Sequence, residues 1–153
     1  LTDFCHPCQV LADLMTIREK FGSFSGLKMC FIGDGNNMAN SLIVGGLKVG
    51  MNVAVATPDG YKPDGVVLEF TKGYGDKFAL ETDPFMAASG ADILITDTWT
   101  SMGEEAEKEE RKKIFKDYQT APRSRKRGRY GPALSPGIPR TGDYRGSLRG
   151  TCR

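Results

Sequence analysis

Two segments of the chain place charged and polar side chains where they could hold a small ligand. In IGDGNNMANS, Gly33 and Gly35 precede a stretch with helical spacing, so backbone amides at a helix N-terminus could face an anionic group. In TDTWTSMG, Asp97 follows an apolar run, and a carboxylate at the tip of a buried strand would suit a ligand ammonium group. Side by side, the two segments would offer an anion site and a cation site together.

Each segment also has a simpler interpretation. IGDGNN is not a dinucleotide-binding fingerprint, because Met38 stands where the third glycine would be. Asn36 or Asn37 could instead cap the following helix. Ser101 followed by Glu104 could be an ordinary helix entry, since acidic residues suit the positive end of the helix dipole.

A third segment, CHPCQ, holds His6, the one histidine of the chain, and Gln9 one helical turn later. Because residues three apart share a helix face, the imidazole and the amide could together hydrogen-bond a carbamoyl-like group. Two alternatives remain. His6 could be a core histidine, and Cys5 with Cys8 could form a C-x-x-C redox or zinc half-site, although no second cysteine pair completes one.

The first element that must position these residues is a helix over residues 6–22. Pro7 suits its first turn and Gly22 its end. The expected apolar stripe of this helix comprises Val10, Leu11, Leu14, Met15 and Ile17.

Apolar runs and helical stretches then alternate along the chain. We predict strands over residues 27–33, 52–58, 77–83 and 92–97, helices over 36–50 and 84–90, and a charged surface helix over 104–118, with 63–75 ambiguous. Strands that are apolar throughout and alternate with helices indicate an α/β fold, a Rossmann-like parallel sheet flanked by helices. In such sheets the ligand lies beyond the carboxyl ends of the strands, where the strand order reverses.

Composition narrows the class of protein. A chain of 153 residues with 39% hydrophobic residues can bury one core. Four cysteines make no disulfide framework, which favours a reducing, cytoplasmic location. No apolar run approaches the ~20 residues that span a bilayer, so we expect no membrane association.

Charge divides the chain into a body and a tail. Of the 21 basic and 19 acidic residues, nine basic residues and one acidic residue lie from Gln119 onward. Residues 119–153 are therefore a basic tail, which we expect to be disordered because its apolar content is low. An alternative function for the tail is a basic arm for nucleic acid.

Taken together, HPCQxLADLxTI, IGDGNNxxNS, ATPDGYxPD and TDTWTSMGxExExxxR resemble, in order and spacing, the ornithine carbamoyltransferases over roughly Leu1 to Gln119. The resemblance implies a two-domain enzyme. Residues 1–118 would be its second, ornithine-binding domain, incomplete here, and homotrimers would form through a first domain absent here.

The resemblance also implies roles for single residues. His6 and Gln9 would contact the carbamoyl group of carbamoyl phosphate, and Asn37 the ornithine carboxylate. Asp97 would bind the ornithine α-amino group, and Ser101 with Met102 would contact the rest of the main-chain end of ornithine. The expected catalytic residues are His6 and Asp97. The δ-amine of ornithine would attack the carbamoyl carbon to give citrulline and phosphate, with no metal or organic cofactor.

Two family motifs are missing, an S-x-R-T-R loop before Leu1 and HCLP after Tyr118, so we expect the isolated chain to be inactive. A non-catalytic amino-acid-binding domain is the alternative. The segment Ala133 to Gly146 can be translated back into permitted codons and then read in a frame shifted by one nucleotide. The shifted frame begins His-Cys-Leu, and with CCG for Pro136 the fourth residue is Arg. In the same shifted frame, Gly142 to Gly150 allow E-I-T-E-E-V-L-E. Because this frame recovers the first three residues of the missing HCLP motif, we hypothesise a one-nucleotide frameshift soon after Tyr118.

Overall fold

The computed structural model describes residues 1–97, 111, 113–118 and 133–134. Its elements in chain order are α1 (Pro7–Phe21), β1 (Lys28–Ile32), α2 (Asn37–Lys48), β2 (Asn52–Ala56), α3 (Gly65–Thr71), the 3-10 helix η1 (Lys72–Lys77), β3 (Phe78–Glu81), α4 (Pro84–Ala88), β4 (Ile93–Thr96), the 3-10 helix η3 (Phe115–Tyr118) and β5 (Ala133–Leu134). None of the helices in these residues is long and apolar enough to cross a membrane.

The strands form one parallel sheet in the order β3-β2-β1-β4-β5. The chain first builds outward from β1 through β2 to β3 and then returns to the other side of β1 with β4. The strand order therefore reverses between β1 and β4. This confirms the predicted α/β fold, while the two-residue strand β5, in the tail, was not predicted.

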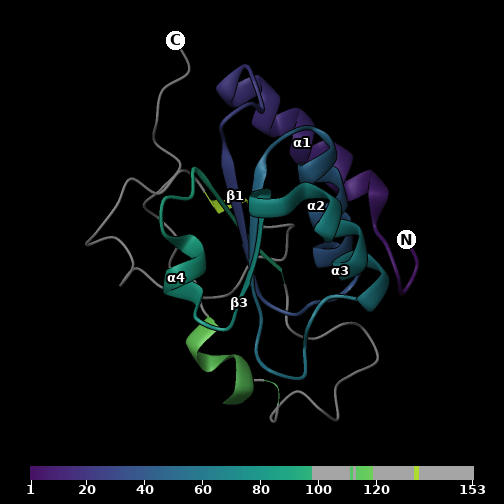
Figure 1. Ribbon diagram of the computed structural model, residues 1–153, viewed down its shortest axis with the longest axis vertical. Coiled ribbons are helices and arrows are strands. Elements are labelled where there is room, and N and C mark those ends of the chain that lie inside the picture. The colour runs from purple at the N-terminus through teal and green to yellow at the C-terminus, as the bar shows by residue number, and fades with distance from the viewer. Residues whose placement is uncertain (98–110, 112, 119–132, 135–153) are drawn as a thin grey trace, which may run out of the picture.

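Helices cover both faces of the sheet (Figure 1). Helices α1, α2 and α3 lie on one face, and α4 with η3 lies on the other. Successive strand residues alternate between the two cores, as the pleat requires. The first core includes Met29, Phe31, Val53, Val55, Ile93 and Ile95, and the second includes Cys30, Ile32, Ala54, Ala56, Leu94 and Phe115.

The apolar stripe of α1 is narrower than predicted. Val10, Leu14 and Ile17 are buried, but Leu11 and Met15 are 62% and 65% exposed. The helix packs mainly on α2, and a single neighbour covers only a narrow stripe of a helix. Positions 11 and 15 lie about 100° further around, beyond that contact.

Caps and glycines set the limits of the helices. Gly22 ends α1 in the left-handed conformation at φ 75°, and its N–H donates to the Arg18 carbonyl at 2.8 Å. Asp64 and Asp83 cap α3 and α4 by accepting from backbone N–H groups two residues on. The ambiguous segment 63–75 becomes α3 and most of η1, with a kink at Gly75.

Most of the predicted charged helix over 104–118 lies outside the described residues. In the described part, Lys113, Lys116 and Asp117 are exposed, as predicted for a charged surface helix, while Arg111, Phe115 and Tyr118 form a buried face. Phe115 and Tyr118 pack into the second core, so this segment covers the sheet face beside α4. Apart from 133–134, the tail 119–153 also lies outside the described residues, and its disorder stays a prediction.

Candidate active site

The loops at the strand-order reversal carry the polar residues that the sequence singled out. Ile32 and Thr96 pair at the carboxyl ends of β1 and β4. The chain continues from β1 through the loop 33–36 to Asn37 at the start of α2, and from β4 into Asp97. A crevice for a ligand forms at such a point because the two following segments leave in opposite directions.

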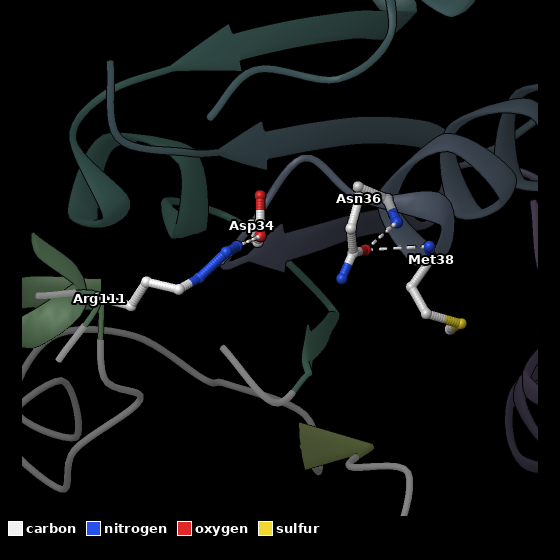
Figure 2. A network of polar contacts seen from close by, with 5 residues as sticks. Asp34, Asn36, Met38 and Arg111 are labelled. Atoms are coloured by element: carbon white, nitrogen blue, oxygen red, sulfur yellow. Dashed lines mark hydrogen bonds and ion pairs between the residues drawn. The ribbon is translucent and has the colours of Figure 1, made fainter. Parts of the chain in front are cut away.

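The loop after β1 is built by a cap and a close backbone approach. The Asn36 side chain accepts from the backbone N–H groups of Met38 at 3.0 Å and Ala39 at 3.3 Å, so Asn36 is the cap of α2 (Figure 2). Gly35 donates its N–H to the Tyr61 carbonyl at 2.9 Å. A Cβ at Gly35 would lie 2.3 Å from the backbone between Lys62 and Pro63, so no side chain fits there.

Asp34 in this loop forms a mostly buried ion pair with Arg111 (Figure 2). The guanidinium carbon of Arg111 lies 5.2 Å from the centre of the Tyr61 ring and 5.9 Å from that of Phe115. Sequence reasoning missed this pair, because 77 residues separate its members. The pair ties the segment that follows β4 to the loop that follows β1.

Asn37, the first residue of α2, donates its side-chain amide to the Thr2 carbonyl at 2.7 Å. One turn further along α2, the Asn40 amide donates to the Phe4 carbonyl at 3.1 Å. The His6 N–H donates to the Ser41 hydroxyl at 2.8 Å. The N-terminal segment therefore runs along the first turns of α2 and brings His6 near the Asn37 end of that helix.

His6 caps α1 without a side-chain hydrogen bond to the helix. Its ring Nδ1 is buried and has no hydrogen-bond partner within the described part of the chain. Gln9 donates from Nε2 to the Oδ1 of Asp13 at 3.1 Å. Asp13 was not predicted as a site residue, although its spacing of four from Gln9 on one helix face was a usable signal.

Electrostatics link Asp13 to both predicted catalytic residues. Burial raises the pKa of the Asp13 carboxyl above 3.8; the Gln9 hydrogen bond and the nearby His6 oppose the shift, and the Asp97 carboxylate adds to it. His6, the cap of α1, and Asp97, after β4, thus both act electrostatically on one buried carboxyl.

Of the predicted substrate-binding residues, Ser101 and Met102 lie outside the described residues. Cys5 and Cys8 are both free thiols. Across residues 1–97 and the later described positions, no group of three metal-ligating side chains occurs. Burial raises the pKa of the third described thiol, Cys30, to about 12, so it stays protonated near neutral pH.

The fold and these loops define an open parallel α/β domain whose strand order reverses between β1 and β4. Residues 25–124 match the domain described as "Aspartate/ornithine carbamoyltransferase, Asp/Orn binding domain". The chain belongs to this family, which confirms the resemblance seen in the sequence motifs.

Known relatives and solved structures agree with this assignment. The chain is 52% identical over 123 residues to the ornithine carbamoyltransferase of Carboxydothermus hydrogenoformans, a match that covers 78% of this chain and 40% of the relative. It is 54% identical to that of Gloeobacter violaceus, covering 78% and 39%. The Pyrococcus furiosus ornithine carbamoyltransferase structure superposes with a TM-score of 0.81 at 44% identity, covering 92% of this chain and 47% of that chain. The chain thus spans about two fifths of the length of the curated relatives it matches.

Proposed function

We propose that this chain is the ornithine-binding part of an ornithine carbamoyltransferase, which transfers the carbamoyl group of carbamoyl phosphate to the δ-amine of ornithine. The observation that carries the proposal is the position of Asn37 and Asp97. Both follow the two neighbouring strands between which the strand order reverses, as a ligand crevice in an open α/β sheet requires. Family membership supports the ligand class.

In this proposal the two charged groups of the ornithine main chain are held separately. Asp97 binds the α-ammonium group by charge, and the amide of Asn37 donates to the α-carboxylate. Ser101 and Met102 complete the same end of the ligand. The Asn37 amide donates to the Thr2 carbonyl in the structure, so ornithine would displace this exposed contact.

His6 and Gln9 hold the carbamoyl group. The neutral δ-amine nitrogen forms a bond to the carbamoyl carbon, the bond from that carbon to the phosphate oxygen breaks, and the departing phosphate takes up the proton that the nitrogen loses. Negative charge develops on the carbamoyl oxygen, where the imidazole Nε2 of His6 can donate. A preorganised donor at such a position contributes ~3 kcal/mol to the transition state.

Isothermal titration of the full chain with ornithine tests the binding half of the proposal. Ornithine should bind, and Asp97→Asn should weaken binding at least ~10-fold because a charged partner is lost. Asp92→Asn is the matched control, since Asp92 lies at the other end of β4 and accepts from the Lys28 backbone. Equal affinities for wild type and Asp97→Asn would contradict the proposal.

Citrulline formation separates an enzyme part from a non-catalytic amino-acid-binding domain. The chain should make citrulline from ornithine and carbamoyl phosphate only when both missing parts are supplied from a relative such as the Pyrococcus furiosus enzyme: its N-terminal half and its C-terminal segment with the HCLP motif. Ornithine binding with no turnover in that assembly would favour the non-catalytic alternative.

A further inference from the structure

A buried carboxylate on α1 has no role in the proposed chemistry so far. Asp13 is 9% exposed and lies on the same helix face as Gln9. Its Oδ1 accepts from the Gln9 amide, and its Oδ2 is buried with no hydrogen-bond partner among the residues that the structure describes. An ionised carboxylate in such a position is costly, so packing alone does not account for an aspartate there.

The contact fixes the orientation of the Gln9 side chain. An amide donates only from Nε2 and accepts only at Oε1, whereas an ionised carboxylate only accepts. Asp13 therefore selects the orientation in which Nε2 of Gln9 turns to the carboxylate. The carbonyl oxygen Oε1 then faces away from Asp13 and presents an acceptor.

We propose that Asp13 is a positioning residue, which holds Gln9 so that its carbonyl oxygen accepts a hydrogen bond from the NH2 group of the bound carbamoyl ligand. This inference rests on the proposed function. It adds a basis for specificity, because an acceptor at this point favours a ligand NH2 and gains nothing from a methyl group. Asp13 thus acts through Gln9, without touching the reacting atoms.

Acetyl phosphate is the probe that isolates this effect. It has the phosphate and the carbonyl of carbamoyl phosphate but a methyl group in place of the NH2. A loss of carbonyl orientation at Gln9 should weaken binding of carbamoyl phosphate and leave binding of acetyl phosphate almost unchanged. A general structural defect would weaken both ligands alike.

The first measurement is the mobility of the Gln9 side-chain amide, by ¹⁵N relaxation in the full chain. We expect an order parameter near ~0.85 in wild type and below ~0.6 in Asp13→Leu, which has similar shape but no acceptor. If Asp13→Leu fails to fold, Asp13→Asn is the variant to use. It keeps an acceptor, but its own amide can flip, so we expect an intermediate order parameter for the Gln9 amide. Glu19→Gln, an exposed change on the same helix, should leave Gln9 unchanged.

The second measurement is the ratio of affinities for carbamoyl phosphate and acetyl phosphate, in the chain assembled with the N-terminal half of a relative. Wild type should prefer carbamoyl phosphate, and Asp13→Leu, which has no acceptor, should reduce the preference ~3- to 10-fold, as expected for one hydrogen bond. Asp13→Asn, which keeps an acceptor, should reduce it less. A rigid Gln9 amide or an unchanged ratio in Asp13→Leu would overturn the inference; if Asp13→Leu does not fold, wild-type order of the Gln9 amide together with a wild-type ratio in Asp13→Asn would do so. If wild type binds neither phosphate, the proposed function fails together with the ligand part of this inference, and amide mobility still decides whether Asp13 positions Gln9.

Discussion

The Arg111 guanidinium forms an ion pair with the Asp34 carboxylate, and the two side chains are 9% and 15% exposed. Asp34 lies in the loop after β1, and Arg111 lies in the segment that follows β4. The pair therefore bridges the two strands between which the sheet order reverses. It holds the loop after β1 against the segment that contains Arg111.

Breaking this pair should destabilise the chain strongly. Asp34→Asn leaves the Arg111 charge buried without its carboxylate, and we expect a loss of about 3–5 kcal/mol in the free energy of unfolding. Urea denaturation measures this. The control is Glu69→Gln, which removes an exposed ion pair with Lys72 and should cost ~0–1 kcal/mol. Equal effects of the two substitutions would contradict a structural role for the buried pair.

Gly35 should not tolerate any side chain. A Cβ at Gly35 would lie 2.3 Å from backbone atoms of the segment Tyr61–Pro63, and a backbone cannot move aside as a flexible side chain can. We expect Gly35→Ala to cost about 1–3 kcal/mol. Gly65→Ala in α3 is the matched control, because nothing lies within 4 Å of its Cβ position and the change should be neutral or stabilising. Thermal unfolding of both variants compares them; a benign Gly35→Ala would show that the loops after β1 and β2 are not in contact.

The Asp13 carboxyl should make stability depend on pH. Burial raises its pKa in the folded chain above 3.8, so folding favours the protonated form. Its contribution is complete below 3.8 and is lost as the pH rises through the folded-state pKa. The groups that face it are Gln9, His6 and Asp97.

Asp13→Asn removes this titration. Relative to wild type, the variant should therefore gain stability as the pH rises from below 3.8 through the raised pKa. Urea denaturation of both proteins at a series of pH values gives the difference in unfolding free energy. A difference that stays constant over this window would mean that the Asp13 pKa is the same in the folded and unfolded chain.

Much of the fold could be predicted from local patterns. The strands β1, β2 and β4 are short, apolar runs between turn residues, and their alternation with helices indicated a parallel sheet. The order of the strands in the sheet was not predicted. The exposure of Leu11 and Met15 could not be predicted, because helical spacing does not say how many neighbours cover a helix. The segment 63–75 stayed ambiguous because its glycines weaken the periodic signal.

In the candidate site, too, only the residues with a local sequence signal could be predicted. Asn37 and Asp97 could be singled out because each follows a strand at the edge where ligands bind. The partner of Asp34 could not, since a pair 77 residues apart leaves no local pattern. Asp13 is an intermediate case: its spacing from Gln9 was visible, but only its burial distinguishes it from an ordinary polar residue on a helix surface.

The frameshift hypothesis predicts one particular codon. If Pro136 is encoded by CCC, the shifted frame reads its last two letters with the first letter of the Gly137 codon as CCG, which is Pro, and completes HCLP. Sequencing the gene checks this. A Pro136 codon other than CCC, or shifted codons without the E-I-T-E-E-V string from Gly142 onward, would contradict the hypothesis.

The central claim is that ornithine binds at the carboxyl ends of β1 and β4, and mapping of backbone amide chemical shifts during an ornithine titration tests it most directly. The largest changes should fall on Gly33–Asn37 and Asp97, with none at Ser25 or Gly50 near the opposite edge of the sheet. Changes concentrated at that opposite edge, or no saturable change anywhere, would contradict the account.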